Sequence, residues 1–267
     1  MGVHGRRQLR AALSILLRPF LLALALTIFV RLFLSPSSSS SSSKRQPPPP
    51  PLTKALVIAS TSDQPRSETS WIDEEVPEDW QVYNYVTDRP ASPGLAVPAN
   101  KGNEAMAYLT YIVDHYDALP DVVFFHHAHR RGWHQELDSP DEVRRLRAGY
   151  VARAGFASAR CLPGCENVIP LAGYSVDPAA LPQHGRNVQL ATLLDEFLDA
   201  AAGERVPRRL AAPCCAQFAA SRAAIRRRGV EWWARLRRWL AETPLDSMTS
   251  GRLMEHTWHV WLGQEAQ

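Results

Sequence analysis

Three histidines within four residues, His126, His127 and His129, form the densest group of potential ligands in this sequence. They directly follow residues 122–125, an apolar run typical of a buried strand. Side chains alternate along a strand, so His127 and His129 are expected to point to the same side at its end. Two imidazoles so placed can bind a divalent metal such as manganese or zinc, or can contact a substrate. The alternative is that these histidines are hydrogen-bonded loop residues at the edge of the fold.

A polar segment continues behind the histidines, with Arg130, Trp133, His134 and Glu136. Ligands collect at the carboxyl ends of strands in open α/β sheets, so this segment is expected to border a ligand site. We predict that Arg130, Trp133 and His134 bind substrate.

A second group lies near the C-terminus, where Glu255 and His259 are one helical turn apart in a stretch that is predicted to be helical. A carboxylate and an imidazole on one helix face can act as a general base and its partner, or as two metal ligands. We predict that both are catalytic, together with His127 and His129. The alternative is a helix-stabilising pair with Trp258 in the core.

Residues 100–104 precede a segment in which Met106 and Leu109 fall on one face of a predicted helix. Asn103 is a candidate cap for the free amides of that helix. Lys101 and the same amides can receive an anion at the positive end of the helix. We predict that Lys101 and Asn103 bind substrate, with an ordinary capped turn as the alternative.

The elements that must position these residues alternate between strand and helix along the chain. A strand, strand, helix, strand order in the first part favours a single α/β domain with a mixed, partly parallel sheet. The predicted strands are residues 55–59, 81–86, 122–125 and 217–220. The first predicted helix begins at residue 103, and the later ones cover residues 141–154, 187–202, 222–228, 232–240 and 250–262.

Composition limits the classes of function. The formal net charge is +3 and charged residues make up 21%, so nothing in the charge balance indicates a nucleic-acid partner. The four cysteines lack the paired spacing of a structural zinc site. Cys161 and Cys165 could close a small disulfide loop under oxidising conditions. Cys214 and Cys215 would point apart in an extended chain, so at most one of them is expected to pair locally.

The N-terminal part indicates a membrane tether. A basic tail, residues 1–10, precedes an apolar segment, residues 11–34, that is long enough to cross a bilayer as a signal-anchor helix. Arg18 and Arg31 interrupt it, so a cleaved signal peptide is the alternative. A Ser/Pro-rich stalk, 35–52, is expected to be disordered and to lead into the globular domain, 53–267. Either interpretation sends this domain into the secretory pathway, and the anchor implies a single-pass type II protein with a lumenal or extracellular domain.

Four segments together resemble a mainly fungal family known as domain of unknown function 3431. The resemblance extends from Leu56 to Gly263, and family members commonly begin with a hydrophobic anchor and a low-complexity stalk. The segments are NKGNEAMAYLTYIVDHYDALPDVVFFHHAHRRGWH, CLPGC, PCCAQFAASRAAI and TPLDSMTSGRLMEHTWHVWLG.

Residues 217–222, with the helix and tryptophan-rich segment after them, are also similar to the strand and helix found late in GT-A glycosyltransferase domains. That likeness implies a nucleotide sugar, a glycan acceptor, Lys101 or Arg130 at the diphosphate, and Glu255 as the base. The chain departs from the GT-A pattern because no Asp-x-Asp follows the third strand, and His127 and His129 stand in its place.

Two other functions remain open from the sequence. A metal-dependent hydrolase would bind zinc with His127, His129 and either His134 or His259, and a glutamate would activate water. A non-catalytic carbohydrate-binding protein would stack sugars on Trp71 and Trp133.

Overall fold

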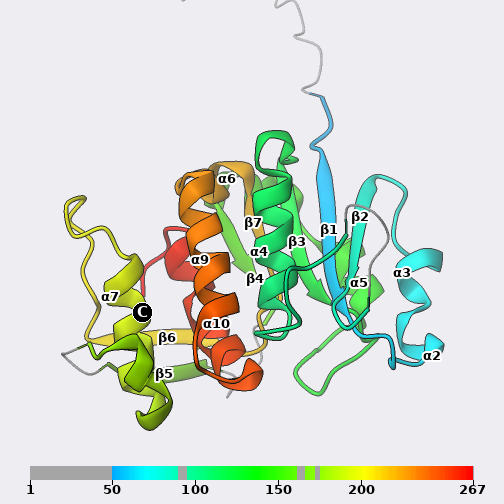
Figure 1. Ribbon diagram of the computed structural model, residues 1–267. Helices are drawn as coiled ribbons and strands as arrows, with labels where there is room; N and C mark the ends of the chain where they lie inside the picture. The colour runs from blue at the N-terminus through cyan, green and yellow to red at the C-terminus, as the bar shows by residue number, and fades with distance from the viewer. Residues whose placement is uncertain (1–49, 90–94, 161–165, 172–174, 267) are drawn as a thin grey trace, which may run out of the picture. The chain divides into compact units, whose positions relative to one another are not determined.

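A five-stranded mixed sheet in the order β2-β1-β3-β7-β4 lies at the centre of the domain (Figure 1). The first three strands in the chain, β1 (Lys54–Ser60), β2 (Trp80–Val86) and β3 (Val122–His127), are parallel. By contrast, β7 (Phe218–Ser221) runs antiparallel to both β3 and β4 (Phe156–Ser158). The predicted α/β class with a partly parallel sheet is therefore confirmed.

Both faces of the sheet are buried, which explains the continuous apolar runs of residues 55–59 in β1 and 122–125 in β3. Alternate residues of each strand enter two different cores. Val57 and Phe125 pack in the larger core, whereas Leu56 and Phe124 pack in the smaller one on the opposite face.

The larger core is covered by the long helices and the smaller core by short ones. Figure 1 shows α4 and α9 side by side in front of the sheet. Trp258 and Trp261 of α10 pack into the same core. Trp71, Val143 and Val151 bring the short helices of the other face into the smaller core. The helices of the two faces are α4 (Ala105–Asp114), α9 (Val230–Glu242) and α10 (Ser247–Trp261) on one, and α3 (Trp71–Glu74), α5 (Ser139–Arg145) and α6 (Ala148–Ala154) on the other.

A separate two-stranded antiparallel sheet joins β5 (Glu166–Pro170) to β6 (Arg209–Pro213). Apart from α7, which has twelve residues, the remaining helices are short. They are α2 (Arg66–Thr69), η2 (Tyr116–Ala118), η3 (Pro178–Gln183), α7 (Arg186–Phe197) and α8 (Arg222–Ile225).

Two local predictions differ from the structure. The helix expected over 141–154 is two helices, because Leu146 has an extended ψ of 122° that ends α5. Asn103 does not cap α4: its φ is 53°, the helix begins one residue after Glu104, and no side chain caps it. Ser221, in contrast, caps α8, because its side chain accepts a hydrogen bond from the Ala224 amide.

The computed structural model describes residues 50–89, 95–160, 166–171 and 175–266. The predicted tail (1–10), anchor (11–34), nearly all of the stalk (35–52) and the Cys161–Cys165 loop lie outside these residues. In the described part of the chain, no helix is both long and apolar enough to cross a membrane.

Candidate functional site

A pocket lies at the carboxyl ends of β1, β2 and β3, where the chain changes the side of β1 on which it adds the next strand. β2 and β3 flank β1 on opposite sides, and ligands commonly bind outside the carboxyl ends of strands at such a position. This strand-end pocket has a volume of about 250 Å³. Its lining comes mainly from the residues at and just after the ends of β1, β2 and β3, and includes Ser60, Thr61, Gln64, Thr87, Asn100, His127 and His129.

A larger pocket of about 490 Å³ adjoins the first, and we call it the helix pocket. The two pockets share Asn103, Glu104 and His127 as lining residues, so they are direct neighbours, and we call them together the hollow. The helix pocket is completed by residues from α10, the start of α7 and two loops, namely Trp133, His134, Arg186, Cys214, Cys215, Met248, Arg252, Glu255 and His256.

Three histidines converge at this hollow, each offering one nitrogen within 4.8 Å of the others: His127, His129 and His134. Their ring centres are 5.1, 5.4 and 5.8 Å apart. Burial lowers the pKa of all three imidazoles, that of His134 to about 4, with a further contribution from neighbouring positive charge. They are therefore neutral near pH 7, the form in which histidine binds metal.

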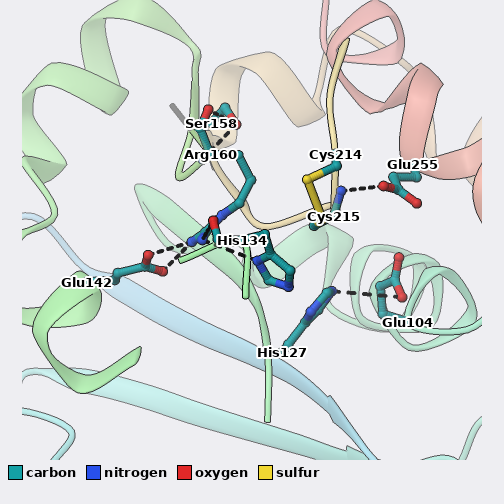
Figure 2. The surroundings of a disulfide bond; sticks show 9 residues. All are labelled: Glu104, His127, His134, Glu142, Ser158, Arg160, Cys214, Cys215 and Glu255. Carbon is teal, nitrogen blue, oxygen red and sulfur yellow. Dashed lines mark hydrogen bonds and ion pairs between the residues drawn. A yellow bond between two sulfur atoms is a disulfide. The ribbon is translucent and has the colours of Figure 1, made fainter. Parts of the chain in front are cut away.

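A buried ion pair supports this cluster from behind (Figure 2). The Arg160 guanidinium binds both oxygens of Glu142 and donates to the His134 carbonyl at 2.9 Å. His126 contacts the same carboxylate at 2.9 Å, so it is a supporting residue and does not line either pocket. Burial raises the pKa of Glu142, but the hydrogen bonds and charges of His126 and Arg160 outweigh this effect and lower it overall.

Two carboxylates face the hollow from opposite helices. Glu104 precedes α4, and its Oε2 lies 3.9 Å from Nε2 of His127. Burial and the charge of Glu255 raise the pKa of Glu104 to about 8. Glu255, on α10, accepts a hydrogen bond from the Cys215 amide, as Figure 2 shows. Because its pKa is about 8, the carboxyl group of Glu104 is mostly protonated near neutral pH.

Two predicted cationic residues are engaged away from the hollow. The Lys101 ammonium donates to the carbonyls of Ala241 and Thr243 at the end of α9. Arg130 binds Glu75. Neither side chain lines the strand-end pocket or the helix pocket.

The remaining predicted residues divide between the hollow and the core. Trp133 lines the helix pocket and is 82% exposed. Trp71 is fully buried and donates to the Ala128 carbonyl, so the expectation that it could stack on a sugar is wrong. His259 lines a separate small cavity of about 20 Å³, and Glu255 borders both this cavity and the helix pocket. Burial lowers the pKa of His259 to about 4.

The adjacent cysteines are bonded to each other, contrary to the prediction that they point apart. Cys214 and Cys215 form a disulfide, with their Cα atoms 3.7 Å apart. The prediction assumed an extended chain, but Cys215 has a φ of 79° and Ala216 a φ of 36°, so the backbone turns there. Both cysteines line the helix pocket (Figure 2).

Sequence reasoning missed several pocket residues. Arg252 and His256 carried a usable signal, because they lie within one turn of Glu255 on the same helix. Glu104 was assigned only to the start of a helix. Arg186 carried no local signal, since the tertiary fold alone brings the start of α7 to the hollow.

Comparison with known proteins places the chain in a family. Neither a curated protein nor a solved structure matches it. Residues 56–267 match the family described as "Protein of unknown function (DUF3431)", in agreement with the resemblance of the four sequence segments. The match covers most of the sequence, and the chain therefore belongs to the DUF3431 family.

Proposed function

We propose that this protein is a glycosyltransferase that transfers a sugar from a nucleotide-sugar donor to a glycan or glycoconjugate. The observation that carries the proposal is the hollow of two neighbouring pockets at the strand ends. One part lies at the reversal point between β1 and β3, where nucleotides bind in doubly wound sheets, and the other part offers space for a second substrate. Antiparallel β7 beside parallel β3 agrees with the GT-A likeness of residues 217–222.

The donor fits the polar lining of the strand-end pocket. Ser60, Thr61 and Thr87 supply hydroxyl groups, and Gln64 and Asn100 supply amides. These groups can hydrogen-bond the ribose and base of a nucleoside. Together the two pockets fall within the roughly 300–1,000 Å³ of common ligand sites.

Positive charge for the diphosphate comes from two residues that the sequence reasoning did not select. Arg186 and Arg252 are exposed and line the helix pocket. Beside burial, their charges contribute to a lowered pKa of His256, about 4, so their field extends into the pocket. Guanidinium groups bind phosphate oxygens in a bidentate manner. In this proposal Arg186 and Arg252 bind the diphosphate, the role that the GT-A likeness implied for Lys101 or Arg130.

The two carboxyl groups have different roles in this scheme. Glu255 accepts the proton of the acceptor hydroxyl, and the resulting oxygen nucleophile attacks the anomeric carbon while the bond to the diphosphate breaks. Glu104, protonated because its pKa is about 8, donates a hydrogen bond to a bound ligand. The exposed face of Trp133 can stack on the acceptor sugar at the pocket entrance.

A donor screen with a matched pair of variants tests the proposal. We expect the domain, residues 51–267, to release nucleoside diphosphate from at least one common nucleotide sugar when acceptor is present. Glu255→Gln should lower this rate by roughly 10²–10⁴-fold without loss of donor binding, because it removes the base. Glu265→Gln, at an exposed site outside the pocket, is the control. Failure of every common donor to bind a folded domain would contradict the proposal.

A metal-dependent hydrolase is the second candidate, and the cluster of His127, His129 and His134 is the observation that favours it. The two functions differ in their products. A hydrolase releases product at the same rate with or without an acceptor, whereas a transferase needs the acceptor for rapid turnover and forms a new glycosidic bond.

We also propose that residues 11–34 tether the protein as a single-pass type II membrane protein with a lumenal domain. The support is the apolar composition of this segment and the basic tail before it. Protease protection of intact microsomes tests the orientation. The domain should resist digestion until detergent is added, and digestion without detergent would contradict the proposal.

A further inference from the structure

We propose that His127, His129 and His134 form a binding site for a transition metal that prefers nitrogen ligands, zinc first among them. The inference rests on the geometry of the three side chains and does not depend on the glycosyltransferase proposal.

The ring positions agree with those around one metal ion. A tetrahedral zinc with Zn–N bonds of about 2.0–2.1 Å places the centres of its imidazole rings roughly 5.2 Å apart. The observed separations are 5.1 Å for His127 and His129, 5.4 Å for His129 and His134, and 5.8 Å for His127 and His134. The three ring centres therefore have the spacing that one tetrahedral ion requires, and their ligand nitrogens lie within 4.8 Å of one another.

Two of the imidazole nitrogens in the cluster lack a hydrogen-bond partner in the described part of the chain. Nε2 of His127 and Nε2 of His129 are buried and have no hydrogen-bond partner among the described residues. A buried polar atom without a partner costs about 1–3 kcal/mol, and native proteins seldom tolerate it without a reason. A metal ion would satisfy both atoms.

Gly132 leaves the space that the imidazoles need. A Cβ atom at this residue would lie 2.8 Å from Nε2 of His129 and 2.8 Å from Nε2 of His134. Any other residue would therefore push the two nitrogens away from their common position.

Buried hydrogen bonds fix the backbone that carries two of the histidines. Ser139 donates to the His129 carbonyl at 2.7 Å, and Arg160 donates to the His134 carbonyl at 2.9 Å. Both donor residues are almost fully buried. Such supporting contacts hold ligands in place before the metal arrives.

The ligand set selects the class of metal. Three neutral imidazoles suit zinc and its neighbours, whereas magnesium and manganese prefer carboxylate and water oxygens. Three protein ligands with a fourth position left for water or substrate are typical of catalytic zinc sites. His127 borders both pockets and His134 the larger one, so that fourth position faces the hollow.

Metal analysis of the full-length protein tests the site. After incubation with zinc and removal of free metal, we expect about one equivalent of bound zinc per chain. His127→Ala, His129→Ala and His134→Ala should each lose it. His184→Ala, outside the cluster and both pockets, should keep it. Cobalt should give the visible absorption of a four-coordinate ion in the wild type and not in the three cluster variants.

Gly132→Ala tests whether zinc binding depends on the arrangement of the histidines, because the new methyl group crowds His129 and His134 without removing a ligand. We expect it to lose zinc while its circular dichroism and cooperative thermal unfolding stay close to those of the wild type. Zinc binding by the cluster variants equal to that of the wild type, or manganese bound as tightly as zinc, would overturn the inference. Zinc bound without any donor binding would keep the metal site and contradict only the glycosyltransferase proposal.

Discussion

Replacing Arg160 with alanine removes one half of a buried ion pair behind the histidine cluster. The side chain of Arg160 is 1% exposed and that of Glu142 is 8% exposed. Without the guanidinium, the carboxylate keeps His126 and Gln135 as its hydrogen-bond partners among the described residues. The His134 carbonyl also loses its donor.

The expected loss of stability is large because the remaining charge stays buried. Removing one partner of a buried pair costs about 3–5 kcal/mol. For a domain of this size, each kcal/mol corresponds to roughly 2–4 °C, so the midpoint of thermal unfolding should fall by roughly 6–20 °C. The effect depends on pH. The lowered pKa of Glu142 contributes stability above the unfolded value near 4.5, and this contribution is lost as pH falls. In the variant, acid should therefore destabilise the domain less.

Urea unfolding of the variant at pH 7 and pH 4 measures both effects. Arg144→Ala serves as the control, because Arg144 is 43% exposed and its ion pairs with Asp141 and Glu75 are both partly exposed to solvent. Each such pair should be worth under about 1 kcal/mol. Combining Arg160→Met with Glu142→Leu should recover much of the loss, since no charge is then left unpaired. A cost below about 1 kcal/mol for Arg160→Ala, or no recovery in the double variant, would refute the reasoning.

Two further predictions concern His259 and Gly102, which line neither of the two pockets. Burial lowers the pKa of His259 to about 4, so the unfolded protein binds a proton at this residue near pH 6.5 and the folded protein does not. The free energy of unfolding should therefore fall by up to about 3 kcal/mol between pH 6.5 and 4. In urea titrations, His259→Asn should make this fall smaller. Gly102→Ala should destabilise the domain by at least about 1 kcal/mol more than Gly203→Ala, because both have positive φ but only Gly102 places its Cβ within 2.6 Å of Leu240. Equal effects in thermal unfolding would contradict this packing argument.

The fold could be predicted where one physical signal dominated. β1 and β3 contain uninterrupted apolar runs, residues 55–59 and 122–125, as is typical of strands buried on both faces. β4 has only three residues and no usable alternation, so it was missed. The break between α5 and α6 was missed as well, since no glycine or proline lies within two residues of Leu146, and Gly149 falls inside α6.

The site could be predicted in part for the same reason. His127, His129 and His134 come together because the end of a strand fixes where the following side chains lie. Lys101 was misplaced because a long flexible ammonium side chain binds whichever carbonyls the tertiary fold brings near, here those at the end of α9. Arg186 enters the hollow only through the packing of α7, which no local pattern encodes.

Donor binding with a blocked pocket tests the central claim most directly. Thr61 is exposed and lines the strand-end pocket, so Thr61→Trp should fill the space assigned to the nucleoside. Ala202→Trp, exposed and outside both pockets, is the matched control. In calorimetric titrations with nucleotide sugars, the wild type and Ala202→Trp should bind one donor equally, and Thr61→Trp should lose that binding while remaining folded. Donor binding by Thr61→Trp equal to that of the wild type would contradict a nucleotide site at the strand ends.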